Sequence, residues 1–460
     1  MNQKIISKLR DIVGEKWVIT DPEKIRSYLV DETAEPVRPT PVEEVILVKP
    51  RTAKEISLIL KLANKEKIPV YPRGGGTGLV GGCIPLSKGI VISLERMDKI
   101  EIDKDNLMAI AEAGVTLGKL IEEAEKAGLF FPAHPGDEGA QIGGLIACNA
   151  GGSRAVRTGV MRNYVKGLEV VLPTGEIITL GGKLIKNNTG YSLLHLIIGS
   201  EGTLGIITKA ILRLYPKYAA SATLIIPFEN RSDAIKAVPE ILRAGIIPLA
   251  LEYVERDVIE KSAKRLGLTW PCKEGNSFLM IIVAEMNEDA VLLECEKIAE
   301  ICSKYTKYEP LIADTAREQR EILKIRSEIY MALKADMIDI LDIVVPPSNM
   351  SQIIDKIDEI AKKYNIYIPV YGHAGDGNLH AHIMKVDGWT EEDYERVKLE
   401  IYRATIELGG SISGEHGIGI IRKKYLSLYL SNTEIELMRE IKRIFDPNNI
   451  LNPGKVIPNL

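Results

Sequence analysis

The glycine-rich stretch RGGGTGLVGG occupies residues 73–82 and follows a short apolar run at 68–71, which predicts a β-strand. The stretch contains the pattern GxGxxG, which is typical of Rossmann dinucleotide sites when it opens a helix. Here a proline and a serine follow instead, and the next regular element is a strand-like run at 90–94. The sequence therefore predicts a strand, a loop and a second strand, and argues against a Rossmann site.

Two further glycine-rich stretches lie in the same half of the chain. PAHPGDEGAQIGGLIACNAGGSRAVRTG spans residues 132–159 and GSEGTLGIIT spans 199–208. Both lie near expected strand ends, where bare backbone N–H groups can line a cavity for phosphate. Tight turns are an alternative explanation for any one of these loops, but tight turns do not require three of them. The pattern favours a binding site for a phosphate-containing ligand.

Histidines gather towards the end of the chain. GHAGDGNLHAHI spans residues 372–383 and SGEHGIG spans 413–419, so four of the six histidines lie in two short segments. Histidine is the commonest metal ligand and the usual general base near neutral pH, and glycines let the backbone approach a ligand closely. The alternative is a set of core histidines in a turn-rich region. The clustering favours a metal-assisted catalytic centre.

The spacing of these residues supports a metal site. His380 and His382 begin an expected strand and point to one face of it, since side chains at i and i+2 share a face. The Gly-Asp-Gly turn at 375–377 can bend His373 back towards His380, and Glu415 adds a carboxylate. Two imidazoles and one carboxylate with open positions suit Zn²⁺, Mn²⁺ or Fe²⁺ in a catalytic site.

Bulk properties limit the class of protein. With 460 residues and a net charge of −4, the chain is long enough for two or more domains and gives no reason to expect nucleic acid. Its start, MNQKIISKLRDIVGEKW, reads as an amphipathic helix rather than a secretory signal, and no apolar run approaches the roughly 20 residues of a transmembrane helix. Five scattered cysteines favour reduced thiols in the cytoplasm, with peripheral membrane association left open. They are Cys83, Cys148, Cys272, Cys295 and Cys302.

The texture of the sequence changes near residue 218, where glycine becomes sparse and strand-like runs alternate with longer amphipathic helices, one of them at 317–334. This pattern predicts a second, α+β domain with an antiparallel sheet. The expected organisation has four parts. They are an N-terminal helical segment at 1–40, a glycine-rich domain at 41–218, a domain with the metal site at 219–445, and a C-terminal segment at 446–460 that packs back on the first domain.

Taken together, the loops and the histidine cluster resemble the flavoprotein family of D-lactate, glycolate and D-2-hydroxyglutarate dehydrogenases, within the wider vanillyl-alcohol oxidase type of FAD enzymes. The resemblance runs from about residue 40 to 456 and rests on several motifs in their expected order. These are PRGGGTGLVGG, IGGLIACNAGG with RTG, GSEGTLGIIT, GHAGDGNLH, SGEHGIG and FDPNNILNPGK. It implies an α+β fold, with an FAD-binding domain of two subdomains followed by a cap domain that binds the substrate.

The resemblance implies that the glycine-rich loops hold FAD. In the first loop the implied residues are Arg73, Gly74, Gly75, Gly76, Thr77, Gly78, Gly81 and Gly82. In the second they are Pro135, Gly143, Gly144, Asn149, Gly151, Gly152, Arg157 and Gly159. In the third and near the C-terminus they are Gly199, Glu201, Gly202, Gly205, Ile206, Ile207, Thr208 and Asn452. Covalently flavinylated relatives carry a histidine in the first loop, which has none here, so FAD is expected to be non-covalent. His134 lies near the second loop, and its role is left open.

The resemblance also assigns roles within the histidine cluster. It implies that His373, His380 and Glu415 bind the metal and that His416 is the catalytic base. The family often has asparagine at the position of His382. This departure leaves open whether His382 binds the metal, contacts the substrate or orients a ligand.

Arg326, in the segment EILKIRSEIYMAL, is implied to bind the substrate carboxylate. Its planar guanidinium matches a carboxylate with two hydrogen bonds, and Tyr330 one turn further is expected on the same helix face. Without the resemblance, an arginine on a charged helix is more often solvated. Between Arg326 and residue 346 the only other basic side chain is Lys334, which favours a monocarboxylate substrate.

The expected function is that of an FAD- and metal-dependent dehydrogenase. It oxidises a D-2-hydroxy acid, with D-lactate or glycolate favoured, to the 2-oxo acid by hydride transfer to flavin N5. The alternatives are a D-2-hydroxyglutarate dehydrogenase, an oxygen-using oxidase and a flavin subunit that serves in electron transfer. The acceptor is left open among an electron-transferring flavoprotein, a quinone, a cytochrome and an iron–sulfur subunit, and so is a homodimer.

Overall fold

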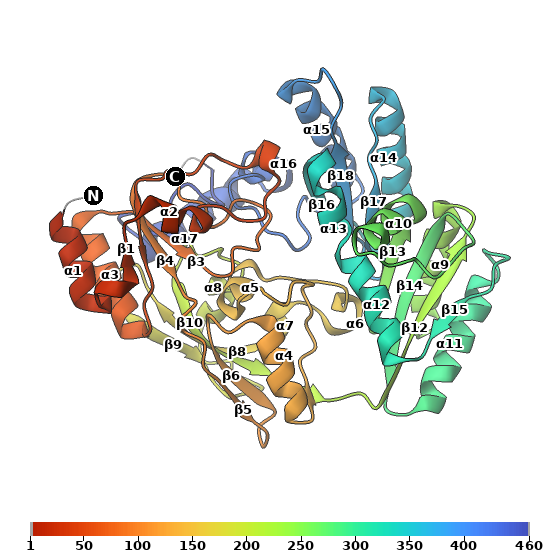
Figure 1. Ribbon diagram of the computed structural model, residues 1–460, viewed down its shortest axis with the longest axis horizontal. Coiled ribbons are helices and arrows are strands. Elements are labelled where there is room, and N and C mark those ends of the chain that lie inside the picture. Colours follow the sequence, from red (N-terminus) through yellow and green to blue (C-terminus); the bar gives the residue numbers. More distant parts are fainter. Residues whose placement is uncertain (1–2, 459–460) are drawn as a thin grey trace. The chain divides into compact units, whose positions relative to one another are not determined.

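The computed structural model describes residues 3–458 and divides into two compact units (Figure 1). Unit 1 comprises the chain up to Gly151, then Val160–Lys217, then the chain from Glu415 onwards. Unit 2 comprises Gly152–Gly159 and Tyr218–Gly414. Residues 415–445 are expected from the sequence in the second domain, but in the structure they belong to unit 1.

The first sheet of unit 1 has four strands in the order β1-β2-β4-β3. Their bounds are β1 Val18–Ile19, β2 Val45–Val48, β3 Val70–Arg73 and β4 Gly89–Ser93. The strands β2, β4 and β3 are parallel to one another, and β1 pairs antiparallel with β2. Every residue of β2 and β4 is buried, as expected for parallel strands that are covered on both faces.

Two helices contribute to the core of this sheet. Apolar residues of α1 (Gln3–Val13) and α3 (Ala53–Glu66) pack in one cluster with residues of β2, β3 and β4. The helix α3 begins where the side chain of Thr52 accepts a hydrogen bond from the N–H of Glu55. The glycine-rich loop leaves β3 and leads to β4 without an intervening helix, so the argument against a Rossmann site is confirmed.

The second sheet of unit 1 is antiparallel and has five strands in the order β5-β6-β10-β8-β9. Their bounds are β5 Ile100–Asp103, β6 Met108–Glu112, β8 Val165–Val171, β9 Ile177–Gly181 and β10 Ile206–Arg213. The strands β8 and β9 form an antiparallel hairpin. Two short strands, β7 (Leu129–Phe130) and β11 (Tyr215–Pro216), pair separately.

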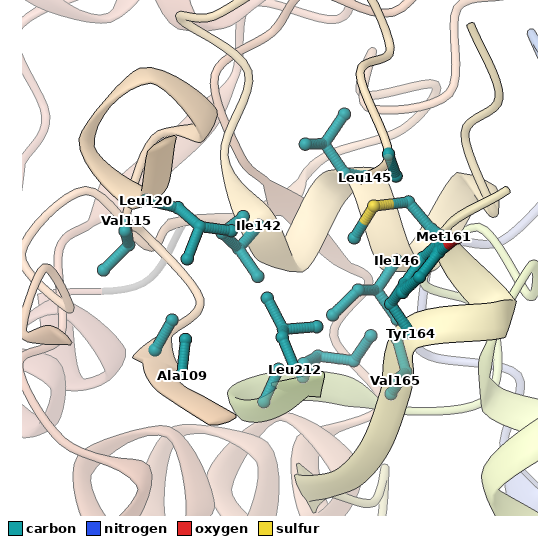
Figure 2. Close-up of a cluster of buried hydrophobic side chains, with 14 of the residues drawn as sticks. Ala109, Val115, Leu120, Ile142, Leu145, Ile146, Met161, Tyr164, Val165 and Leu212 are labelled. Carbon is teal, nitrogen blue, oxygen red and sulfur yellow. The ribbon is translucent and has the colours of Figure 1, made fainter. Parts of the chain in front are cut away.

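Figure 2 shows the hydrophobic cluster that joins this sheet to two helices, α4 (Leu117–Lys126) and α5 (Ile142–Cys148). Leu120 of α4 and Ile142 and Ile146 of α5 have no exposed surface, and they lie with Ala109 and Leu212 of the sheet. The helix α5 begins inside the second glycine-rich stretch. Its burial therefore fixes where that stretch lies. The short helices of unit 1 are α2 Pro22–Ile25, α7 Met161–Tyr164, α8 Leu193–Ile197 and α16 Leu426–Tyr429.

The C-terminal helix α17 (Asn432–Phe445) is held in unit 1 by a buried lysine. The Nζ of Lys442 donates to the carbonyl oxygens of Thr203 (2.8 Å) and Leu451 (2.8 Å) and pairs with the carboxylate of Asp446 (2.5 Å). Asp446 in turn accepts hydrogen bonds from the N–H groups of Ile450 and Leu451. These bonds explain why this part of the chain belongs to unit 1. The last two residues of the expected C-terminal segment lie outside the described range.

Unit 2 is built on a seven-stranded sheet in the order β15-β12-β14-β13-β17-β18-β16, in which every strand pair is antiparallel, as predicted. The strand bounds are β12 Ala220–Phe228, β13 Ala250–Glu255, β14 Ser277–Glu285, β15 Leu311–Ala313, β16 Met337–Val344, β17 Val370–His373 and β18 Asn378–Met384. The inner strands β12 and β14 are almost entirely buried.

The helices of unit 2 form two groups by their contacts with one another. The first group is α9 Arg231–Arg243, α11 Glu288–Cys302, α14 Met350–Tyr364 and α15 Glu391–Glu407. The second group is α10 Arg256–Arg265, α12 Ala316–Ser327 and α13 Ile329–Leu333. The short helix α6 (Ala155–Thr158) lies in Gly152–Gly159, the first of the two chain segments that make up unit 2.

The helix predicted at 317–334 is broken in the structure. Its parts α12 and α13 meet at Glu328, whose ψ of 3° leaves the helical region. No glycine or proline marks this break in the sequence, and periodicity alone does not reveal it. Among the described residues, none of the helices combines the length and the apolar character that a membrane span requires.

Candidate active site

The first glycine-rich loop presents a row of backbone amides. None of the N–H groups of residues 75–80 donates a hydrogen bond to another residue of the described range. The next N–H group, that of Gly81, donates to Oγ1 of Thr33 (2.8 Å) and so ends the row. Successive backbone N–H groups of this kind form a concave site for an anion.

Arg73 lies at the end of β3, directly before this loop, and its charged group does not face solvent. Its side chain is buried, and Nη1 donates to the carbonyl oxygens of Val30 (2.7 Å) and Tyr28 (3.2 Å). Nη2 donates to the carbonyl oxygen of Ser27 (3.1 Å). The resemblance implies a cofactor contact for Arg73, but these donors bind the segment 27–30.

The second loop divides between the two units. Pro135, Gly143, Gly144, Asn149 and Gly151 lie in unit 1, whereas Gly152, Arg157 and Gly159 lie in unit 2. A methyl group added to Gly144 would meet open space, so the backbone of α5 is accessible there. His134 is half-buried, and its Nε2 lies 3.4 Å from Oε1 of the neighbouring Glu138.

The guanidinium of Arg157 donates hydrogen bonds to residues of unit 2. Its Nη1 donates to the carbonyl oxygen of Ala284 (2.9 Å), and its Nη2 donates to Oε1 of Glu285 (2.6 Å). Its charged end also lies 5.2 Å from the ring centre of Tyr218. These contacts differ from the cofactor contact that the resemblance implies, because they fasten the short segment Gly152–Gly159 to the sheet of unit 2.

In the third loop the carboxylate of Glu201 also has partners within its own unit. Its oxygens accept hydrogen bonds from the N–H groups of Ile418 (2.8 Å) and Gly419 (2.8 Å). The side chain of Asn452 donates from Nδ2 to the carbonyl oxygens of Gly82 (2.9 Å) and Glu201 (2.9 Å). The remaining predicted residues of the third loop, Gly199, Gly202, Gly205, Ile206, Ile207 and Thr208, lie in unit 1 at and before the start of β10.

In unit 2, the hairpin of β17 and β18 brings two predicted metal ligands together. His373 pairs with Asn378 across the hairpin, and the rings of His373 and His380 lie 5.3 Å apart, nearly perpendicular at 89°. Both side chains are buried. The turn at 374–377 thus brings His373 close to His380, as the spacing predicts.

A buried carboxylate of the neighbouring strand fixes the orientation of His373. Glu252, in β13, has no exposed surface, and its Oε1 lies 2.6 Å from Nδ1 of His373. Its Oε2 lies 2.5 Å from Nη2 of Arg326, an ion pair without the alignment of a hydrogen bond. Burial alone raises the pKa of Glu252, but the charge of Arg326 and the hydrogen bond from His373 help to lower that pKa overall. An ionised Glu252 accepts the Nδ1 proton, which leaves the ring lone pair of His373 on Nε2.

A second buried carboxylate lies beside His380. Asp342, in β16, is the cross-strand partner of His380, and its Oδ1 lies 3.7 Å from Nδ1 of that ring. Asp342 also accepts hydrogen bonds from Nδ2 of Asn378 (2.9 Å) and Oγ of Ser413 (3.0 Å). Two imidazoles, each with a carboxylate beside it, are the donor set and outer support of many metal sites, so the residues fit a divalent metal.

Glu252 and Asp342 do not appear among the residues predicted from sequence. Their signal is present, because each is a charged residue inside an apolar run, ALEYVE and MIDILDIV. A charge that is buried in a strand requires a partner of opposite charge or a hydrogen-bond donor. The sequence does not show which partner the fold provides.

Arg326 and the predicted substrate residues converge on one aromatic ring. The guanidinium carbon of Arg326 lies 4.8 Å from the ring centre of Tyr371, and the ring of His382 stacks on Tyr371 at 5.2 Å. The ring of Tyr330 lies 6.3 Å from that of His382, although the helix breaks between Arg326 and Tyr330. His382 has no exposed surface, and its Nδ1 lies 3.1 Å from Sδ of Met337.

Glu415 and His416 begin the last segment of unit 1. Oε1 of Glu415 lies 3.8 Å from Nε2 of His416, and both side chains are largely buried. A methyl group on Gly151 would meet Oε2 of Glu415 at 2.7 Å, so Glu415 lies against the end of the second loop. Glu415 directly follows Gly414, whose N–H donates to the carbonyl oxygen of Asp342 (2.9 Å) in unit 2.

Family models cover most of the chain. The model described as FAD binding domain matches residues 45–181, and the model described as FAD linked oxidases, C-terminal domain, matches residues 217–456. Each match falls on sequence that carries the motifs described above. The second match covers more than half of the chain.

Three relatives match almost end to end. D-lactate dehydrogenase of Archaeoglobus fulgidus is 45% identical over 94% of this chain and 96% of that protein. Glycolate oxidase subunit GlcD of Bacillus subtilis is 41% identical over 89% and 88% of the two chains. D-2-hydroxyglutarate dehydrogenase of Stutzerimonas stutzeri is 30% identical over 98% of each.

Solved structures support the fold. The structure of p-cresol methylhydroxylase with substrate bound matches with a TM-score of 0.77 at 18% identity, over 99% of this chain and 96% of that chain. At this identity the likeness shows the fold alone, and it confirms the vanillyl-alcohol oxidase type of architecture. The chain is an FAD-linked oxidoreductase and belongs to the family of FAD-dependent D-lactate, glycolate and D-2-hydroxyglutarate dehydrogenases.

Proposed function

We propose that the enzyme oxidises a small D-2-hydroxy acid, D-lactate or glycolate, to the 2-oxo acid with non-covalent FAD and a divalent metal ion. The observation that carries this proposal is the buried group formed by Glu252, His373 and Arg326 beside His380. It combines a site for a metal with a cation for a carboxylate. A 2-hydroxy acid offers a hydroxyl oxygen to the first and a carboxylate to the second.

The first loop supports the FAD part of the proposal. The N–H groups of residues 75–80 make no hydrogen bonds within the described chain, which suits the pyrophosphate of FAD. Residues 73–82 contain no histidine, the side chain that carries covalent flavin in relatives, so the bound FAD is dissociable.

The chemistry divides among a few side chains. When bound, FAD supplies the hydride acceptor and the metal supplies a Lewis acid for the substrate hydroxyl. We assign metal binding to His373, His380 and Glu415, and carboxylate binding to Arg326. His416 accepts the proton of the α-hydroxyl on its imidazole, a role that contributes about 10²–10⁴ in rate.

The environment of Arg326 favours a monocarboxylate. Nη2 of Arg326 is paired with Oε2 of Glu252 at 2.5 Å, but Nε makes no hydrogen bond within residues 3–458, so the guanidinium retains a donor for one carboxylate. One observation favours D-2-hydroxyglutarate as a second candidate. The Nζ of Lys334 lies 5.5 Å from the ring centre of Tyr330, and this places a further cation next to the same aromatic cluster.

Anaerobic reduction of the bound flavin by a panel of substrates tests this proposal. D-lactate, L-lactate, glycolate and D-2-hydroxyglutarate are mixed separately with the oxidised holoenzyme, and loss of the yellow flavin absorbance is followed in time. D-lactate or glycolate is expected to reduce the flavin fastest, with L-lactate far slower. Fastest reduction by D-2-hydroxyglutarate would support the second candidate, and no reduction by any of the four would refute both.

The electron acceptor and the compartment belong to the same proposal. One relative, 33% identical over 90% of this chain, is named D-lactate dehydrogenase [cytochrome], mitochondrial, from Arabidopsis thaliana. We propose that a separate carrier reoxidises the flavin, because the five cysteines are all free thiols and make no disulfide or cluster within the described chain. Free thiols are also typical of the cytoplasm.

A further inference from the structure

Glu201 holds the turn that follows His416. Glu201, Ile418 and Gly419 all belong to unit 1, and the Glu201 side chain is 91% removed from solvent, since its exposed fraction is 9%. Each of its carboxylate oxygens accepts one backbone N–H, Oε1 from Ile418 and Oε2 from Gly419, both at 2.8 Å. These two hydrogen bonds hold the main chain of residues 418 and 419.

The main chain of Glu201 is equally constrained. Its φ of 50° is left-handed, which is uncommon for a residue with a side chain and indicates that the surroundings enforce it. Its N–H donates to the carbonyl oxygen of Ala147 (2.8 Å) in α5, and its own carbonyl accepts from Asn452 (2.9 Å). Asn452 also donates to Gly82 in the first loop. Glu201 therefore connects the turn after His416 to both loops of the proposed flavin site.

The turn at residues 417–419 lies close against the carboxylate of Glu201. Gly417 has a φ of +85°, and a methyl group there would lie 2.9 Å from Oε1 of Glu201. The buried guanidinium of Arg422 donates from Nη1 to the carbonyl oxygen of Gly417 (2.9 Å). Glu201 thus holds N–H groups of this turn while Arg422 holds a carbonyl group. The backbone directly after His416 is fixed from both sides.

We propose that Glu201 is a positioning residue for His416, which orients the imidazole by holding residues 417–419, and is not a ligand of the cofactor. This inference rests on the proposed function, in which His416 is the base. It also replaces the role that the family resemblance implies for Glu201. Both carboxylate oxygens have backbone partners, so the side chain is satisfied without a cofactor contact.

The test begins with Glu201→Gln. Glutamine keeps one acceptor oxygen but turns an NH₂ group towards the other N–H, so that two donors face each other. The rate constant of anaerobic flavin reduction is expected to fall by on the order of 10- to 100-fold, because small displacements of a catalytic group cost that much. Flavin content and the substrate concentration for half-maximal rate are expected to stay within about twofold. The control is Glu434→Gln, which alters an exposed carboxylate that accepts the N–H of Ser431 (2.9 Å) in the same unit and is expected to change nothing.

A double-mutant cycle with His416→Asn decides whether Glu201 acts through the imidazole. In the His416→Asn background, Glu201→Gln is expected to slow reduction by less than about twofold, because the group it positions is already absent. If His416→Asn is slow and the fold-reductions of the two single variants multiply in the double variant, the inference is overturned and the proposed function stands. A native rate in His416→Asn would show instead that the proposed base is wrong, and the inference falls with it.

Two further outcomes are informative. Activity of Glu201→Gln that falls in proportion to lost flavin would identify a cofactor ligand and overturn the inference. Should Glu201→Gln fail to fold, Gly417→Ala carries the same cycle, because its methyl group would lie 2.9 Å from Oε1 of Glu201 and displace the carboxylate. A slow Gly417→Ala enzyme with native flavin content, and no further loss in the His416→Asn background, supports the inference. A native rate in Gly417→Ala overturns it.

Discussion

Glu252 shows how one buried residue links two functions in unit 2. It lies inside an antiparallel sheet with no exposed surface, where an ionised carboxylate is stable only with charged or hydrogen-bonding partners. His373 and Arg326 are these partners. The carboxylate therefore contacts both the imidazole that we propose for the metal and the guanidinium that we propose for the substrate. Removing it disturbs both, and leaves the Arg326 charge without its counterion.

The first prediction in unit 2 concerns Glu252→Ala. The variant is expected to lose about 3–5 kcal/mol of unfolding free energy, as is usual when one partner of a buried ion pair is removed. Its affinity for the proposed metal is expected to fall by about 10- to 100-fold, because His373 loses the acceptor that fixes its tautomer. Urea unfolding gives the first quantity, and competition with a metal chelator gives the second.

The matched control is Glu255→Ala on the same strand. Glu255 is also buried, and within residues 3–458 its side chain pairs with Arg231 at 2.5 Å and accepts a hydrogen bond from Tyr253, not from a histidine. This variant is expected to lose stability and to keep its metal affinity. Equal loss of metal in both variants, or native metal affinity in Glu252→Ala, would contradict the role given to Glu252.

At the scale of elements, the hairpin of β17 and β18 depends on Gly377. Its φ is +84°, and a methyl group there would overlap the carbonyl oxygen of Val345. Its N–H donates to the carbonyl of His373 (3.1 Å), and its carbonyl accepts from the N–H of Val345 (3.1 Å). The turn that places His373 beside His380 therefore has no room for any other residue at this position.

Gly377→Ala is accordingly expected to distort the hairpin and to lose metal binding. Gly388→Ala is the matched control, because Gly388 has a similar φ of +80° but open space around it. Both variants suffer the left-handed strain of about 1–2 kcal/mol, and only Gly377→Ala adds the overlap with Val345. Urea unfolding and metal content of the two purified proteins compare them. Equal losses in both would show that the overlap is relieved without cost to the site.

Some features of the helices and strands can be predicted from the sequence, and others cannot. The strands expected at 68–71 and 90–94 and the proximity of His373 to His380 follow from apolar patterns and turn residues, which act over a few neighbours along the chain. The break at Glu328 does not, because no helix-breaking residue marks it. The partnership of Glu252 with His373 is set by the pairing of β13 with β17, which joins residues 121 positions apart. Local patterns hold no information on such pairing.

Site residues show a related limit. The motifs indicate that Arg73, Arg157 and Glu201 are needed where they stand, but not which atoms they contact. In the structure Arg73 holds the segment 27–30, Arg157 holds the sheet of unit 2, and Glu201 holds the turn after His416. Each of these long or charged side chains reaches across to a distant segment. Among the predicted glycines, those of residues 75–80 have backbone N–H groups without hydrogen bonds in the described chain, whereas Gly143, Gly159 and Gly199 donate to backbone carbonyl groups.

At the scale of the whole molecule, unit 1 is assembled from three chain segments and contains the first glycine-rich loop. The N–H groups of residues 75–80 make no hydrogen bond within the described chain, and Gly75 and Gly78 are exposed, so these amides are open to an anion. An anion bound there would satisfy them. FAD is therefore expected to contribute to the stability of unit 1 as well as to catalysis.

The last prediction follows from this dependence and from the absence of histidine in residues 73–82. Acid precipitation of the yellow holoenzyme is expected to release the flavin into the supernatant, because no covalent bond holds it. Added back to the flavin-free protein, FAD is expected to raise the thermal midpoint as its concentration rises, by mass action, with about 2.7 kcal/mol gained at 100 times Kd. Riboflavin, which has no pyrophosphate, is the control and is expected to stabilise far less, since it leaves the amides of the first loop without a partner. Flavin that stays in the acid pellet would refute non-covalent binding, and equal stabilisation by riboflavin would show that the first loop is not the pyrophosphate site.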